Sequence, residues 1–305
     1  MTGTTATTLV RPLRGLRYDP GRVDLGACLA PPYDVIDDAA RRELAARDAH
    51  NIVGVDAGTD EPGDEAGVRD RYTRAAERLD AWTAAGVLRR DDRPAVYVHD
   101  HAFRTEDGRP AVRRGVVLRV RALPWGESDV LPHEHTLRGP KEDRLRLMRA
   151  TGMQTSAVFL LWDGAAGVEG LLRAATAGPP AASAQTPDVE GEAHALWVVD
   201  DPAAVDAVAD ALGSARLYMA DGHHRFETAA AYAAERRSAE PGAGPDADHA
   251  WTLAYVCAAG DPALQVLPTH RLVLPGAGVP DRLGDLLARL DGRYAIEPRA
   301  SLADA

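Results

Sequence analysis

Lysine is almost missing from this chain of 305 residues: Lys141 is the single lysine among 35 basic residues. Together with the abundance of Ala, Gly, Asp and Arg, this indicates a bias that replaces lysine wherever arginine will serve. A lysine that persists can mark a position where a compact ammonium fits and a planar guanidinium does not. The alternative is chance, and the residues around Lys141 must decide between the two.

Cysteine is also scarce, and a long apolar run is absent. Cys28 and Cys257 lie far apart and match no metal-binding spacing. No secretory leader is recognisable, so we expect two reduced thiols in a cytoplasmic protein. No run of about 18 apolar residues occurs, which predicts that the chain does not span a membrane.

Basic residues are outnumbered by acidic ones, 35 against 46, which gives a net charge of -11. This balance argues against a nucleic-acid or anionic-membrane partner, because either needs a basic face. A local basic site remains compatible with it. The expected partners are therefore a small-molecule substrate and a nucleotide, and the oligomeric state is left open.

Hydrophobic periodicity predicts alternating helices and strands. The expected helices are 38–48, 68–85, 141–151, 201–212 and 225–237. The expected strands are 95–103, 113–123, 156–163, 193–200, 216–220 and 263–274. Residues 251–258 fit either type, and 56–67 and 175–187 are expected to be surface loops.

This mixture predicts an α+β or mixed α/β fold, with a mixed sheet and flanking helices. We expect a disordered N-terminus (1–8), an N-terminal α/β part (9–125) and a C-terminal α/β part (126–305). The last residues read as a strand and a frayed tail, so a C-terminal segment is expected to be missing.

The stretch "ADGHHRFETA" places an acid, two imidazoles and a guanidinium at a strand-to-helix turn. Gly222 permits a tight turn, and the helix start directs N–H groups and a positive dipole end at its contents. Arg225 can add a bidentate contact to a phosphate. His223 and His224 could donate to that anion, bind a metal or relay a proton, and Asp221 could hold Mg²⁺ or accept a hydroxyl proton. The alternative is a capped helix with solvated side chains.

A second motif, "LPHEHTLRGPKEDR", leads into another predicted helix. Lys141 and Arg144 share a helix face and could bracket a polyanion. His133 and His135 point the same way from an extended chain and could share a metal, although local spacing supplies no third ligand. Glu134 with Lys141 and Arg144 suits phosphate better than zinc. An ordinary solvated helix start is the alternative.

Two weaker motifs follow prolines. "APPYDVI" presents Tyr33 and Asp34, and "LPTHRLV" presents His270 and Arg271. Each alone is more often structural, but each could line a substrate site. The phosphate-binding, dinucleotide and serine-hydrolase motifs that are recognised by their glycines do not occur.

These four motifs occur in the same order in the domain of unknown function 1015 family, which the chain resembles from about residue 13 to about residue 273. The DGHHR turn is similar to that of free-serine kinases in the ParB/sulfiredoxin-like superfamily. That resemblance implies a related core, in which Gly222, His223, His224 and Arg225 hold nucleotide phosphates and Asp221 lies near the reacting hydroxyl or a magnesium ion. The family's association with serine-biosynthesis enzymes implies serine or phosphoserine as substrate.

The expected function is therefore that of a phosphotransferase acting on a small hydroxyl metabolite, a free-serine kinase that uses Mg²⁺ and ATP or ADP. The alternatives are a metal-dependent phosphohydrolase and a sensor that binds nucleotide or phosphometabolite without turnover. The expected catalytic residues are Asp221 (also a magnesium ligand), Glu134, Lys141 and His224. The expected cofactor-binding residues are Gly222, His223, His224, Arg225 and Arg144. The expected substrate-binding residues are Tyr33, Asp34, His133, His270 and Arg271.

Overall fold

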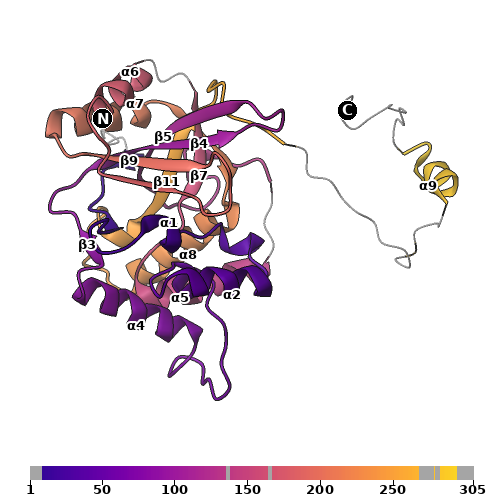
Figure 1. Cartoon of the computed structure of the whole chain (residues 1–305), viewed down its shortest axis with the longest axis horizontal. Coiled ribbons are helices and arrows are strands. Elements are labelled where there is room, and N and C mark those ends of the chain that lie inside the picture. Colours follow the sequence, from indigo (N-terminus) through magenta and orange to yellow (C-terminus); the bar gives the residue numbers. More distant parts are fainter. Residues whose placement is uncertain (1–8, 135–137, 164–166, 268–277, 279–281, 294–305) are drawn as a thin grey trace. The chain divides into compact units, whose positions relative to one another are not determined.

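The computed structural model describes residues 9–134, 138–163, 167–267, 278 and 282–293 of the chain (Figure 1). The chain divides into two compact units, Met1–Leu264 and Gln265–Ala305. The first unit holds a large sheet and the helices around it. The described part of the second unit contains the helix α9, Leu283–Leu290.

A mixed sheet, nine-stranded over the described residues, forms the centre of the first unit. Its strand order is β6-β10-β7-β11-β5-β4-β9-β8, with β1 paired to β5. The β6–β10 and β7–β11 pairs are parallel and the others antiparallel. The strands are β1 (Val10–Arg11), β4 (Val96–Arg104), β5 (Pro110–Arg121), β6 (Val130–Leu131), β7 (Val158–Asp163), β8 (Ala182–Gln185), β9 (Ala193–Val199), β10 (Arg216–Asp221) and β11 (Trp251–Ala258).

Helices flank this sheet on both sides, which confirms the predicted mixed α/β class (Figure 1). On one side α6 and α7 pack into the same buried cluster as the strands. On the other side lie α5, α8 and the N-terminal helices. The helices are α1 (Leu25–Cys28), α2 (Asp38–Arg47), α3 (Val53–Asp56), α4 (Arg71–Ala84), α5 (Arg138–Thr151), α6 (Val168–Ala175), α7 (Pro202–Gly213) and α8 (His223–Ala239), with 3-10 turns η1 (Tyr33–Val35) and η2 (Asp248–Ala250).

Short-range signals account for where several helices begin. Asp37 caps α2 by accepting from two backbone N–H groups. Asp70 and Thr73 form a capping box at α4. Asp201 caps α7, whose first residue is a proline. These caps satisfy amide groups that a helix leaves without partners in its first turn.

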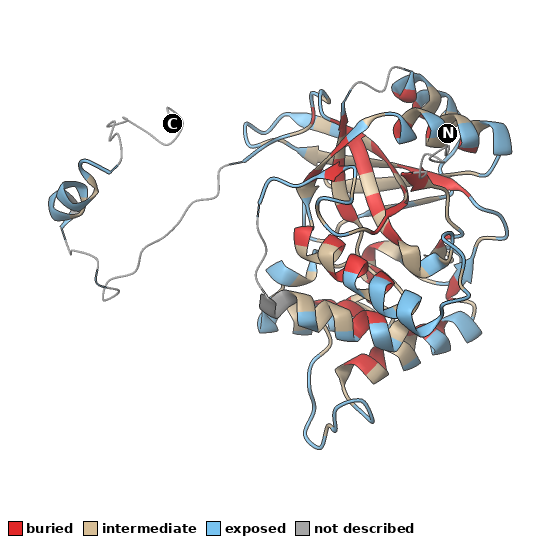
Figure 2. Ribbon diagram, turned by 180° about the vertical axis from the view of Figure 1, so that it is seen from behind, coloured by how far each residue is buried: buried red, intermediate tan, exposed pale blue. Residues whose placement is uncertain are grey.

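The two faces of the central strands differ in burial (Figure 2). Val96 and Val98 of β4 are fully buried in the cluster that includes α6 and α7. Tyr97, which lies between them and points the other way, is also buried, whereas His99 and His101 on the same face as Tyr97 are only half-buried. Because side chains alternate along a strand, one face carries the core and the other a band of polar and aromatic groups.

Two local predictions need correction. Residues 175–187 are not a continuous loop, because α6 ends at the first of them and Ala182–Gln185 forms β8 by pairing with β9. Residues 264–267 form no strand, and the remainder of the predicted strand 263–274 lies outside the described residues. The ambiguous apolar segment Trp251–Ala258 is a strand between β5 and β7.

The N-terminal strand β2 (Leu16–Tyr18) pairs with β3 (Leu88–Arg90) in a separate two-stranded sheet. The two parts expected on either side of residue 125 both contribute strands to the large sheet. Cys28 and Cys257 are buried and unpaired. None of the helices in the described ranges has the length and apolar character needed to cross a membrane.

Candidate functional site

Side chains from three separate sequence motifs meet where α5 and α8 begin. Glu134 Oε1 lies 3.1 Å from Nδ1 of His223. The Arg144 guanidinium lies over the Tyr33 ring, 3.9 Å from its centre. We call this group the DGHHR site; it comprises Tyr33, Glu134, Lys141, Arg144, Asp221, Gly222, His223 and Arg225.

Gly222 makes the turn from β10 into α8. Its φ of 93° lies in the left-handed region, which favours glycine. A Cβ atom there would lie 3.0 Å from Nε and 3.1 Å from Cζ of Arg225. Glycine therefore serves both the backbone turn and the close approach of the guanidinium.

Arg225 folds back over this turn. It donates one hydrogen bond to the carboxylate of Asp221 and another to the backbone carbonyl of Ala157. Its side chain is 15% exposed, whereas that of Asp221 is 63% exposed. The Ala157 carbonyl thus holds the guanidinium in place. Its more exposed partner, the Asp221 carboxylate, is one that an incoming anion could replace.

His223 is almost fully buried, with 1% of its surface exposed. Its Nε2 accepts a hydrogen bond of 3.4 Å from the backbone N–H of His133. We therefore assign the ring proton to Nδ1, which faces Glu134 at 3.1 Å. Burial lowers the pKa of His223, although the nearby Glu134 carboxylate acts to raise it. The neutral imidazole orients Glu134, whose own side chain is 54% exposed.

His133 belongs to the same layer of contacts. Its Nδ1 donates to the backbone carbonyl of Met219 at 2.8 Å, and its ring meets that of His223 edge to face at 4.5 Å. Both rings therefore hold the segment around His133 and Glu134 against β10. His135, the other half of the predicted histidine pair, lies outside the described residues.

Lys141 reaches from α5 to α8. Its Nζ lies 2.6 Å from Oε2 of Glu227, and Oε1 of the same carboxylate accepts a 2.7 Å hydrogen bond from the indole of Trp125. Trp125 stacks on Phe226 with ring centres 4.5 Å apart. Glu227 thus positions the ammonium of Lys141, whose side chain remains 30% exposed.

Arg144 is the least accessible of the three cations, at 11% exposure. Its Nη1 lies 3.0 Å from Asp56, and its Nε donates to Asp143 at 2.8 Å. Asp143 also accepts from Tyr72 and Arg71. Arg144 is held on several sides, an arrangement that suits a supporting role beneath the more exposed groups.

Asp56 is a member of this network that sequence reasoning missed. It begins the acidic stretch expected to be a solvated loop, but it is the last residue of α3 and only 6% exposed. Besides Arg144 it accepts hydrogen bonds from Thr155 at 2.5 Å and Ser156 at 3.1 Å. The signal that could have identified it is its position directly after the apolar residues Val53 and Val55.

A cavity of about 30 Å³ lies between Arg144 and Arg225, and Asp56 and Thr228 also line it. This volume holds roughly two water molecules, whereas small-molecule sites typically measure about 300–1,000 Å³. The cavity is therefore too small for a small-molecule ligand, and the exposed carboxylates of the DGHHR site are Asp221 and Glu134.

The remaining predicted site residues are placed as follows. Asp34 is exposed in η1 beside Tyr33. His224 lies half-buried in the first turn of α8, and its carbonyl accepts a hydrogen bond from Thr228. His270 and Arg271 lie outside the described residues.

The family comparison covers nearly the whole chain: the model of the family described as "Protein of unknown function (DUF1015)" matches residues 10–299. No curated protein and no solved structure matched. The family match spans both units, including all the motifs that build the DGHHR site. By this match, the chain belongs to the DUF1015 family of proteins of unknown function.

Proposed function

We propose that this protein is a phosphotransferase that phosphorylates free serine, with ATP or ADP as donor and Mg²⁺ as cofactor. The observation that carries the proposal is the position of three cations on the adjoining helices α5 and α8, Lys141, Arg144 and Arg225. Each is paired with a carboxylate, of which Asp221 is exposed. Phosphoryl transfer depends mainly on positioning and on neutralising charge, and a cluster of this composition can supply both.

Arg225 and Lys141 are the groups we assign to phosphate. Both are partly exposed, and each is held by a carboxylate, Asp221 or Glu227. A phosphate that replaces Asp221 on Arg225 would receive a bidentate contact and the first amides of α8. The displaced Asp221 would then be available to bind Mg²⁺ or to accept the proton of the serine hydroxyl.

Glu134 is the second candidate to orient the serine hydroxyl. One of its oxygens faces the Nδ1–H of His223, and the side chain is half exposed. A carboxylate fixed in this way can accept a proton in a defined direction. The similarity of the DGHHR turn to free-serine kinases of the ParB/sulfiredoxin-like superfamily also supports this assignment.

The metal-dependent phosphohydrolase is less well supported at this site. Both nitrogens of His223 already have partners. A histidine needs a free lone pair to bind a metal. His223 could do so only by giving up one of these contacts.

The test is to incubate the protein with serine, Mg²⁺ and either ATP or ADP, and to detect phosphoserine by mass spectrometry. We expect phosphoserine with one of the two donors. Nucleotide binding without product would indicate the sensor, and release of phosphate from phosphoserine would indicate the phosphohydrolase. Failure to bind nucleotide at all would contradict the proposal.

Arg225→Ala sharpens this test. Loss of a charge-assisted contact should weaken nucleotide binding by about 1.5–3 kcal/mol, measured by calorimetry. Because Arg225 also bonds the Ala157 carbonyl, some loss of stability should accompany it. The matched control is Arg146→Ala, which removes an exposed cation of α5 and should leave affinity unchanged. Equal affinities in all three proteins would show that Arg225 does not bind the nucleotide.

A further inference from the structure

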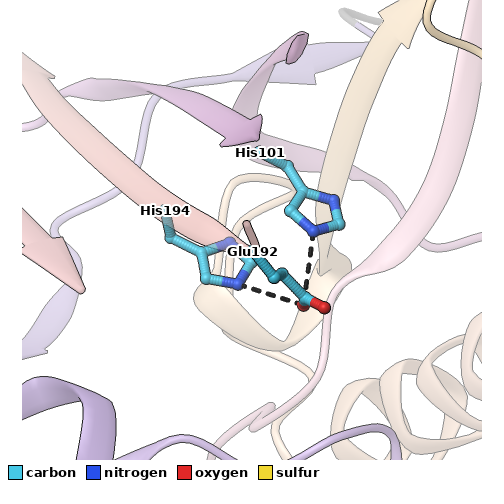
Figure 3. Close-up of side chains that lie close together, drawn as sticks. All are labelled: His101, Glu192 and His194. Carbon is cyan, nitrogen blue, oxygen red and sulfur yellow. Dashed lines mark ion pairs between the residues drawn. The ribbon is translucent and has the colours of Figure 1, made fainter. Parts of the chain in front are cut away.

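A second group of chemistry-bearing side chains lies on the strands at the other end of the sheet order (Figure 3). His101 of β4 is the cross-strand partner of His194 of β9, and Glu192 immediately precedes β9. Their two imidazoles and one carboxylate converge in Figure 3. With His99, which contacts His194, we call them the histidine cluster.

We propose that His101, Glu192 and His194 bind a divalent transition-metal ion, with zinc as the best fit. Glu192 Oε1 lies 3.3 Å from Nε2 of His101 and 3.6 Å from Nε2 of His194, and the three ligand atoms all lie within 4.8 Å of one another. Ligands about 2.0–2.1 Å from a tetrahedral zinc ion are about 3.3–3.4 Å apart. The ligand atoms therefore need only small movements to surround the ion.

The state of His101 supports this assignment. Its Nε2 is buried and makes no hydrogen bond within the described residues, although the Glu192 oxygen is close. A buried polar nitrogen without a hydrogen bond is costly, and a metal ion would satisfy it.

Outer contacts already orient the other ligands. Nδ1 of His194 lies 3.1 Å from Nε2 of His99, so that His99 can accept its proton when Nε2 of His194 faces a metal. Thr186 donates to Glu192 at 3.2 Å. The three ligand side chains are 20–28% exposed, which leaves a path for the ion and a position for water or substrate as fourth ligand.

Two groups oppose the metal. Thr186 Oγ1 lies 3.2 Å from Nε2 of His194, and this contact must be given up when that nitrogen binds the ion. Nη2 of Arg113 lies 3.3 Å from Nδ1 of His101, and a metal on Nε2 requires a proton on that Nδ1. Arg113 must therefore move away when the ion binds, and its charge weakens the affinity. We expect Arg113→Gln to bind the metal more tightly than the unchanged protein. If the histidine rings of the cluster served only to stack on one another, this substitution would not tighten metal binding.

The experiment is a titration of Co²⁺ into full-length protein that has been dialysed against a chelator. We expect one equivalent to bind with the strong visible absorption of four-coordinate cobalt, and Zn²⁺ to displace it. His194→Gln should weaken binding by more than about a hundredfold, because loss of an outer-shell partner alone costs about 10–100-fold. His249→Gln removes a histidine outside the cluster and should bind like the unchanged protein.

Two results would overturn the proposal: no saturable binding by the unchanged protein, or equal binding by His194→Gln and His249→Gln. If circular dichroism shows that His194→Gln is unfolded, Glu192→Gln and Arg113→Gln decide instead. Glu192→Gln should bind more weakly and Arg113→Gln more tightly, and no change in either would count against the site. The outcome does not depend on whether the protein phosphorylates serine.

Discussion

The DGHHR site and the histidine cluster both gather polar side chains at the sheet, but they manage charge differently. In the DGHHR site, arginine and lysine are paired with carboxylates and remain charged. In the histidine cluster, two imidazoles face one carboxylate, Glu192, and burial lowers the pKa of the adjacent His99 to about 4. The first arrangement suits a ligand that brings negative charge, and the second suits one that brings positive charge.

They also differ in how far apart their residues lie in the sequence. The DGHHR turn is a run of five consecutive residues, so a reader of the sequence finds it at once. The histidine cluster joins His99 and His101 to residues more than 90 positions later. A site made from neighbours in sequence leaves a motif, whereas a site made by strand pairing leaves none.

The largest expected effect is on the buried support of the DGHHR site. Asp56→Ala should lower the free energy of unfolding by about 3–5 kcal/mol, because it removes one of the carboxylates that hold the buried Arg144, together with the acceptor of Thr155 and Ser156. Urea unfolding measures this loss. The exposed Asp34→Ala should change stability within about 0.5 kcal/mol. Equal unfolding free energies of the two variants would show that Asp56 does not hold Arg144 as inferred. Cobalt binding at the histidine cluster should be unaffected in both variants.

Lys141→Arg tests whether the single lysine is required. The variant keeps the charge but places a larger planar group against Glu227, and a misplacement of about 1 Å can cost about a hundredfold in rate. We expect a normal fold and loss of most phosphoserine formation. The reciprocal exchange Arg146→Lys on the same helix should keep full activity. Unchanged turnover in Lys141→Arg would mean that the lysine persists by chance.

Gly222→Ala separates backbone strain from ligand contact. Alanine in the left-handed region costs roughly 1–2 kcal/mol, and here its Cβ would also press on Arg225. Gly167 begins α6 with nearly the same φ, 91°, but has open space around it, which makes Gly167→Ala a matched control. Both variants should lose similar stability in urea, and only Gly222→Ala should bind nucleotide more weakly. Equal affinities would separate Gly222 from the phosphate site.

The smallest expected effect concerns the two thiols, which should react only slowly with an alkylating reagent. Burial raises the pKa of Cys28 to about 11 and that of Cys257 to about 12, so at pH 8 the reactive thiolate is scarcer than in a free cysteine. Arg113, the neighbour of His101, lowers the pKa of Cys257 but is outweighed by burial. Mass spectrometry after iodoacetamide should find neither modified in folded protein and both modified in urea. Rapid modification of Cys257 alone would indicate that the sheet opens beside the histidine cluster.

Sequence by itself determined the elements whose signals are local. The strand–glycine–helix order around Gly222, the caps Asp37 and Asp201, and the strands β4 and β5 all follow from nearby residues. In the structure, Tyr33 of the APPYDVI motif contacts Arg144 of the LPHEHTLRGPKEDR motif, and Glu134 of that second motif contacts His223 of the DGHHR turn.

Tertiary structure alone decided which distant residues become partners. Ala182–Gln185 is a strand because β9 offers its edge, and not because its residues favour strands. Asp56 is buried because α5 brings Arg144 to it across 88 positions of chain. His101 faces His194 because the register of β4 and β9 places them opposite each other, and a shift of one residue would turn them to opposite faces. Such contacts depend on register and on the packing of layers, which no short stretch of sequence contains.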